Sequence, residues 1–259
     1  MATRIAFADV EDDRVVAAVQ QLQGVADLSV VCADSVIAAA ELVRDGSVDA
    51  GIAGSITSSP DCIRAALKTI GTAAPGGFAC GCFFMHLGDR VLTYADPAVV
   101  PHPDAAQLAS IAIEGADAHR RLTGEEPLVA LLSFSTLGSA EHPAVSKVRD
   151  AVKLVRERRP DIKVDGELQF DVAIDAAVAA RKCPESPVAG NANVFVFPDL
   201  DAGNIAYKIT ERLAGARAIG SFVLGLRRPW VDLSRGCSVD DIVGAAHAIV
   251  RITHEKVPA

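Results

Sequence analysis

The sequence predicts an α/β protein with a mostly parallel sheet, and three observations support this. Short apolar runs alternate with amphipathic stretches along the chain, which is typical of successive β-α-β units. Half of the 259 residues are apolar, so the chain can bury a sizeable core. Residues 71–77 are rich in Gly, Ala and Pro, which indicates a hinge between two domains.

Three strand-helix pairs are expected before this hinge. Short apolar runs predict strands, and apolar residues recurring every three or four positions predict helices. The expected strands are 4–8, 28–31 and 50–53, and the expected helices are 12–22, 35–44 and a segment from about 60 to 70.

Two adjacent strands are expected directly after the hinge, at 78–85 and 91–94, with a turn at Gly88 and Asp89. Asp104 and Gln107 have the spacing of a capping box, so a helix is expected over 104–122. Four valines at 145, 148, 152 and 155 predict one buried face of a helix over 142–158. The remaining expected strands are 128–132, 194–197 and 221–224, and the remaining helices are 201–213 and about 240–256.

Charge and composition exclude several classes of function. The chain has 33 acidic and 25 basic residues and a net charge of −8, which argues against general binding to nucleic acid or anionic lipid. No apolar run approaches the ~20 residues that cross a bilayer, and acidic residues appear too early for a signal peptide, so a cytoplasmic location is expected. The six cysteines lack CxxC or zinc-ligand spacing and are expected to be free thiols or small buried side chains.

Three polar loops, at 54–59, 133–139 and 198–204, each follow an expected strand and precede an expected helix. Open parallel sheets bind ligands beyond the carboxyl ends of their strands, where helix N-termini and hydroxyls can hold a phosphate or acyl phosphate. The alternative is that Ser, Thr and Asp only cap the following helices. None of the loops has Walker A or GxGxxG spacing, so phosphotransfer from a nucleotide lacks support.

A fourth segment, residues 231–241, carries an arginine, hydroxyls, a thiol and carboxylates just before the last expected helix. A hydrolytic triad fits poorly, because no histidine has a recognisable place beside Ser234. With Ser238 at the helix start, Asp241 has capping-box spacing, which is one explanation for its position.

Several motifs together resemble the phosphate acetyltransferases (phosphotransacetylases), over roughly residues 51–249. The most specific are FPD at 197–199 with the residues up to 208, and DLSRGCS at 232–238, and VDGELQ at 164–169 also matches. The others are TSSPDCIR at 57–64, FFM at 83–85, RPD at 159–161 and the segments 96–103, 132–139 and 189–193.

The resemblance implies a fold and an activity. The fold would have two α/β/α domains similar to isocitrate and isopropylmalate dehydrogenases, with the site in an interdomain cleft. The first domain would be discontinuous, comprising residues 1–75 and 224–259, and the second would comprise 76–223. The segment between the first expected helix and the strand at 50–53, residues 24–48, is shorter than in typical members. Ala65 stands where members usually have proline.

The implied reaction is acetyl-CoA + phosphate ⇌ CoA + acetyl phosphate, in acetate metabolism, by a homodimer without a metal or redox cofactor. CoA would be a co-substrate, and nucleic acid or membrane partners are not expected. The alternatives are a phosphate propionyl- or butyryltransferase, and a non-catalytic acyl-CoA-binding regulatory module.

The resemblance also implies roles for individual residues. Asp241 would be the base that takes the thiol proton, Ser234 would hydrogen-bond the thiol or the developing oxyanion, and Arg235 would pair with phosphate. Cys237 would pack or position rather than act as a nucleophile, because direct transfer needs no acyl-enzyme. The candidate substrate-binding residues are Ser133, Ser135, Thr136, Gly138, Ser139, Thr57, Ser58, Arg64, Asn204 and Lys208.

Overall fold

The computed structural model describes residues 2–74 and 77–254. By its internal contacts the chain forms two compact units, one of Met1–Ala79 with Ala218–Ala259 and one of Cys80–Arg217. Each unit is an α/β layer structure with mostly parallel strands, which confirms the predicted fold class. Within the described ranges, no helix is long and apolar enough to span a bilayer.

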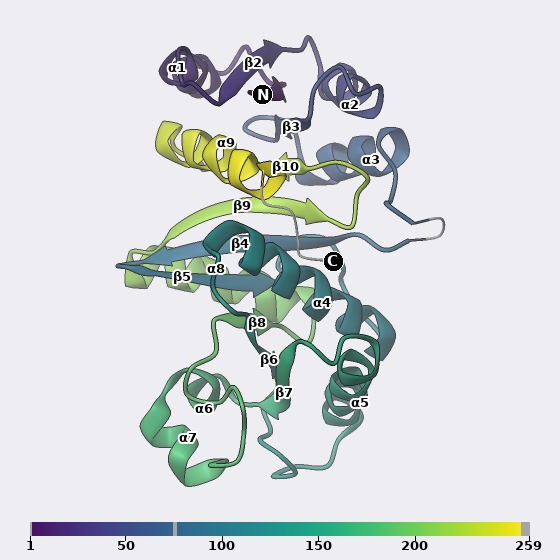
Figure 1. The fold of residues 1–259 in the computed structure, drawn as a ribbon, viewed down its shortest axis with the longest axis vertical. Coiled ribbons are helices and arrows are strands. Elements are labelled where there is room, and N and C mark those ends of the chain that lie inside the picture. The colour runs from purple at the N-terminus through teal and green to yellow at the C-terminus, as the bar shows by residue number, and fades with distance from the viewer. Residues whose placement is uncertain (1, 75–76, 255–259) are drawn as a thin grey trace. The chain divides into compact units, whose positions relative to one another are not determined.

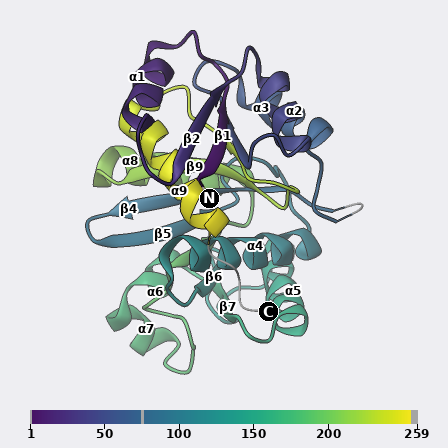
Figure 2. The same cartoon turned by 45° about the horizontal axis from the view of Figure 1, so that its top comes forward.

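The first unit contains a sheet in the order β2-β1-β3-β10-β9, in which the first four strands are parallel and β9 is antiparallel to β10. Helices α1 and α9 pack on one side of this sheet, and α2 and α3 on the other (Figures 1 and 2). The strands are β1 (Thr3–Phe7), β2 (Leu28–Cys32), β3 (Ala50–Ala53), β9 (Arg217–Leu224) and β10 (Trp230–Asp232). The helices are α1 (Asp13–Leu22), α2 (Val36–Arg44), α3 (Ser59–Thr69) and α9 (Val239–His254).

The core of this unit includes Trp230, which is fully buried. Its indole lies directly over Gly51 of β3, where an added Cβ would come within 2.4 Å of the ring. Only glycine lets the indole approach the sheet this closely, so Gly51 sets the packing between β3 and β10.

The second unit contains a sheet in the order β4-β5-β8-β6-β7, in which β4 and β5 form an antiparallel hairpin and the other neighbours are parallel. The strands are β4 (Cys80–Leu87), β5 (Arg90–Ala95), β6 (Leu128–Leu132), β7 (Lys163–Leu168) and β8 (Val194–Val196). The helices are α4 (Ala105–Thr123), α5 (Pro143–Arg158), α6 (Phe170–Ile174), α7 (Ala176–Lys182) and α8 (Leu200–Ala214).

Helices cover both faces of this second sheet. Successive residues of a strand point to opposite faces. On β5, the Tyr94 hydroxyl is hydrogen-bonded to Thr210 of α8, whereas the neighbouring Ala95 lies beside Gly115 of α4. Helices α4 and α8 therefore lie on opposite faces. In Figure 1, α5 lies to the right of β6 and β7, and α6 and α7 lie to the left.

Most predicted elements are present, with ends shifted by a few residues. The capping box of Asp104 and Gln107 is confirmed in both directions, and the four valines of α5 are buried. Residues 75–76 of the predicted hinge, and the predicted end of the last helix beyond residue 254, lie outside the described residues.

Strands β7 and β10 and helices α6 and α7 were not predicted. The sequence of β7, KVDGEL, has no apolar run, because it buries two carboxylates, Asp165 and Glu167. Strand β10 has three residues, and α6 and α7 have five and seven, so none is long enough to show a clear period.

Candidate functional site

Three loops of the first unit leave the carboxyl ends of the neighbouring parallel strands β1, β3 and β10. Asp9 follows β1 with a φ of 56°, and its buried carboxylate accepts hydrogen bonds from the Gly54 amide at 2.7 Å and the Thr57 hydroxyl at 2.5 Å. The loop after β10 begins with the Leu233 amide bonded to the Ala53 carbonyl at 2.7 Å. The loops are thus held together at one edge of the sheet, where open α/β sheets bind ligands.

The loop after β10 presents Ser234 and Arg235 to solvent. A turn closed by the Cys237 amide and the Ser234 carbonyl at 2.9 Å gives this loop its shape, and the Ser234 hydroxyl accepts from the Gly236 amide at 3.3 Å. Among residues 2–74 and 77–254, the Arg235 guanidinium has no ion pair or hydrogen bond. Its five donors are therefore available to an anion such as phosphate.

Asp241 lies in the first turn of α9 and caps its start. One carboxylate oxygen, Oδ2, accepts from the Ser238 amide at 2.9 Å and from the Ser238 hydroxyl at 2.8 Å, while the Ser238 hydroxyl accepts from the Asp241 amide at 3.2 Å. Within the described part of the chain, the other oxygen, Oδ1, has no hydrogen-bond partner. The capping contacts therefore leave one oxygen able to accept a proton, so the two predicted roles of Asp241 are compatible.

A cavity of about 570 Å³ opens beside these loops, between α2 and α3. Asp9, Thr57, Arg64 and Lys68 are among its lining residues. The Arg64 side chain is more than half exposed, and its guanidinium pairs with Asp61 at 2.5 Å. Ser58 caps α3, because its hydroxyl accepts from the Asp61 amide at 3.4 Å.

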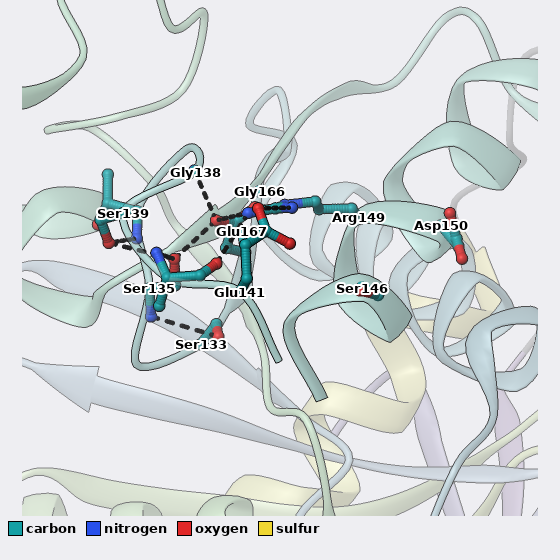
Figure 3. A network of polar contacts seen from close by, with 12 residues as sticks. Ser133, Ser135, Gly138, Ser139, Glu141, Ser146, Arg149, Asp150, Gly166 and Glu167 are labelled. Atoms are coloured by element: carbon teal, nitrogen blue, oxygen red, sulfur yellow. Dashed lines mark hydrogen bonds and ion pairs between the residues drawn. The ribbon is translucent and has the colours of Figure 1, made fainter. Parts of the chain in front are cut away.

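In the second unit, residues 133–139 form the loop between β6 and α5, and Glu167 of β7 lies at its centre (Figure 3). The Glu167 carboxylate accepts from the Ser135 hydroxyl at 2.8 Å, the Gly138 amide at 2.8 Å and Arg149 Nε at 2.8 Å. Burial by itself would raise the pKa of Glu167. The hydrogen bonds from Arg149, the Gly138 amide and the Ser135 hydroxyl outweigh this effect and lower the pKa to about 2.

The backbone of this loop is bonded internally. The amides of residues 135–140 all donate to groups within the second unit. Ser135 and Thr136 are buried, and the Thr136 hydroxyl is bonded to Gln169. The exposed side chains of the loop are Phe134, Leu137 and Ser139. These contacts give Ser135, Thr136 and Gly138 a role in shaping the loop, and direct contact between the loop and a substrate stays a prediction.

Asn204 and Lys208 lie on α8. The Asn204 amide donates to the Pro97 carbonyl at 3.0 Å, and the Lys208 ammonium is bonded to the Tyr207 hydroxyl and lies 4.0 Å from the centre of its ring. Both polar groups therefore have partners within the second unit.

Comparison with known proteins identifies the family. The family described as "Phosphate acetyl/butaryl transferase" matches residues 25–250. The chain belongs to the phosphate acetyl/butaryl transferase family. It is 52% identical over 219 residues to a phosphate acetyltransferase from Paracoccus denitrificans, covering 82% of this chain and 69% of the relative. It is 48% identical over 207 residues to a phosphate acetyltransferase from Clostridium acetobutylicum, covering 78% of this chain and 62% of the relative.

Among solved structures, a phosphotransacetylase from Streptococcus pyogenes superimposes with a TM-score of 0.89 and 33% identity, over 96% of this chain and 93% of that chain. The chain spans 62–69% of the length of the first three curated relatives, which are all phosphate acetyltransferases. The family predicted from the sequence is thus confirmed, and the names of the relatives support the predicted acyl transfer.

The structure of this family member also shows groups that the sequence did not single out. Glu167 is part of the VDGELQ motif at 164–169, but nothing in the sequence indicated that it contacts Arg149 or the loop at 133–139. Asp232, at the end of β10, is 3% exposed, and its Oδ1 has no hydrogen-bond partner among the described residues. Burial raises the pKa of Asp232 to about 6, and the nearby charge of Asp9 adds to the rise, although Ser59 and Cys62 oppose it by hydrogen bonding.

The raised pKa of Asp232 predicts a pH-dependent stability. Between pH 3.8 and about 6 the folded chain holds this proton and the unfolded chain releases it, so stability falls as pH rises through this window. We expect Asp232→Asn to be more stable than the parent protein at pH 7.5, by up to about 3 kcal/mol, with the difference vanishing near pH 4. Urea unfolding at both pH values measures this, with Asp89→Asn in an exposed turn as the control. If the difference in unfolding free energy were equal at the two pH values, the raised pKa of Asp232 would be contradicted.

Proposed function

We propose that this chain transfers an acetyl group between CoA and inorganic phosphate, so that acetyl-CoA + phosphate ⇌ CoA + acetyl phosphate. The observation that carries this proposal is the exposed Arg235, which has no partner among the described residues and lies beside Ser234 on a loop that ends at the Asp241 carboxylate. Such a loop offers an anion-binding fork, a hydroxyl and a proton acceptor within eight residues. Membership of a family with relatives named phosphate acetyltransferases supports the same reaction.

In the proposed mechanism Asp241 accepts the CoA thiol proton through Oδ1, and the thiolate attacks the carbonyl carbon of acetyl phosphate. A carbon–sulfur bond forms, and the carbon–oxygen bond to phosphate breaks. Arg235 neutralises the charge that develops on the departing phosphate, and Ser234 hydrogen-bonds the thiol or the oxyanion. No covalent acyl-enzyme forms, so the step needs no nucleophile from the protein.

Substrate binding is proposed for the remaining predicted residues. In the first unit, Thr57, Ser58 and Arg64 lie in or beside the 570 Å³ cavity, which can hold part of a ligand. In the second unit, the loop at 133–139, Asn204 and Lys208 stay predicted contacts. The absence of a metal or redox cofactor, and a cytoplasmic location, also remain predictions from the sequence and the family.

The proposal is tested by mixing the purified protein with CoA and acetyl phosphate, without added metal, and following thioester absorbance. We expect acetyl-CoA to form well above the protein-free rate. Comparison with propionyl and butyryl phosphate tests acyl preference, for which each methylene is worth only about 1–3 kcal/mol. Turnover equal to background with every acyl phosphate would favour the non-catalytic acyl-CoA-binding module.

Replacement of Arg235 tests its pairing with phosphate. Arg235→Gln is expected to lower kcat/KM for acetyl phosphate by about 10²-fold or more, and Arg235→Lys should not restore it, because an ammonium lacks the planar fork. The loss should appear equally with inorganic phosphate in the reverse direction. Arg44→Lys, on an exposed face of α2, is the control and should keep full activity. Full activity in Arg235→Gln would make Arg235 an ordinary surface charge.

A homodimer is also proposed. Ile205, Ile209 and Leu213 are spaced by one helical turn on α8 and are 57%, 52% and 83% exposed. An apolar stripe of this kind is typical of an interface. Light scattering is expected to give a mass of about twice 27.0 kDa, and Ile209→Lys is expected to give the monomer mass. A monomeric parent protein would contradict this assembly.

A further inference from the structure

Arg14, in the first turn of α1, reaches two of the loops at the carboxyl edge of the first unit. Its Nη1 donates to the backbone carbonyls of Arg235 at 2.9 Å and Cys237 at 2.8 Å. Its Nη2 donates to the Ser55 carbonyl at 2.9 Å. One side chain therefore connects α1, the loop after β3 and the loop after β10.

Asp12 holds the Arg14 guanidinium in place. Its carboxylate, which also caps α1, accepts from Arg14 Nη2 at 2.7 Å and from Nε at 3.1 Å. This paired contact lowers the pKa of Asp12 to about 2, so the carboxylate is charged at neutral pH. With the Nε and Nη2 edge of the guanidinium bonded to Asp12, its remaining donors point in fixed directions.

The two carbonyls that Nη1 contacts lie on either side of Gly236. Holding both fixes the peptide plane between Arg235 and Gly236 and the peptide plane between Cys237 and Ser238, and so restricts the backbone around this glycine. The orientation of these planes determines where the Arg235 side chain leaves the backbone. A cap for α1 would need only Asp12, so these carbonyl contacts are additional to the needs of the helix.

We propose that Arg14 is a positioning residue that holds residues 234–237 in the conformation in which Ser234 and Arg235 act. The expected effect on catalysis rests on the proposed function, whereas the expected effect on the loop conformation does not. The role of Arg14 would be exerted through the backbone of the loop and not through contact with a substrate.

The effect on the loop conformation is tested by amide hydrogen exchange, which does not depend on enzymatic activity. In Arg14→Gln, the amides of residues 233–238 are expected to exchange hydrogen roughly tenfold faster than in the parent protein, because the turn opens locally. Arg44→Gln is the matched control, since Arg44 is an exposed helical arginine of the same unit whose one ion-pair partner among the described residues is Asp45. Arg14→Lys keeps a positive charge beside Asp12 but lacks the planar guanidinium, so it should show the same faster exchange. It replaces Arg14→Gln in the test if that variant does not fold.

The catalytic part is tested by a double-variant cycle. Arg14→Gln is expected to lower kcat by about 10- to 100-fold in the parent protein. It should have little further effect in an Arg235→Gln background, because Arg14 acts by positioning Arg235. Exchange at 233–238 equal to that in Arg44→Gln, or losses that multiply in the double variant, would overturn the proposal. If the parent protein shows no acyl transfer, the proposed function fails, while the exchange comparison still decides the role of Arg14.

Discussion

Asp241→Asn is expected to lower kcat by about 10²- to 10⁴-fold with little change in melting temperature. Asparagine has the same shape and can still accept a hydrogen bond from the Ser238 amide, so the start of α9 should stay capped. It cannot accept a proton at neutral pH, so the step that produces the CoA thiolate should be lost. Parallel measurements of kcat and thermal unfolding separate these two effects.

Two further variants make this test specific to Asp241. Asp240→Asn removes the neighbouring carboxylate of the same helical turn and should leave kcat nearly unchanged. Ser238→Ala removes the capping hydroxyl and should cost about 0.5–2 kcal/mol of stability while most of the turnover remains. If Asp241→Asn were stable and turned over at a near-normal rate, Asp241 would be a capping residue and not the base.

Glu167→Gln is expected to destabilise the second unit by about 2–3 kcal/mol and to lower the melting temperature by roughly 5–10 °C. Glu167 is 1% exposed, and the partners of its carboxylate among the described residues are all donors, from Arg149, Ser135 and Gly138. A glutamine would place an NH₂ group against at least one of these donors. The side chain of Arg149 is 27% exposed, so its guanidinium can regain water, which limits the loss.

The effect of Glu167→Gln should depend on pH. The pKa of Glu167 is about 2 in the folded chain and 4.5 as a free side chain, so its contribution is complete above pH 4.5 and is lost as pH falls toward 2. The difference in melting temperature between the two proteins should therefore shrink between pH 7 and pH 3. Glu141→Gln, which removes an 80% exposed partner of the same arginine, is the control and should change little at any pH. A difference that is constant with pH would contradict the charged role of Glu167.

Short-range patterns in the sequence were enough for much of the fold. The alternating apolar runs predicted eight of the strands because each has an apolar or alternating run of its own. The capping box at Asp104 and Gln107 and the valine face of α5 could be predicted because their partners lie three or four residues apart. The grouping of Ser234, Arg235 and Asp241 is also local, since the motif places them within eight residues.

The supports of the candidate site could not be predicted in this way. Arg149 and Glu167 are 18 residues apart, Asp9 and Thr57 are 48 apart, and Arg14 and Arg235 are 221 apart. Strand β7 was missed for the same reason, because its buried carboxylates are tolerated only when Arg156 and Arg149 of α5 lie beside them.

The sequence by itself therefore determined the order of most strands and helices, the family and the residues that carry the proposed chemistry. These depend on periodicity, capping and motif spacing, which are properties of neighbouring residues. Only the tertiary structure decided which loops are held rigid, which amides are already bonded and which buried carboxylates are paired. A buried charge or amide is stable only with a partner, and which distant residue becomes that partner is set by how the strands and helices pack.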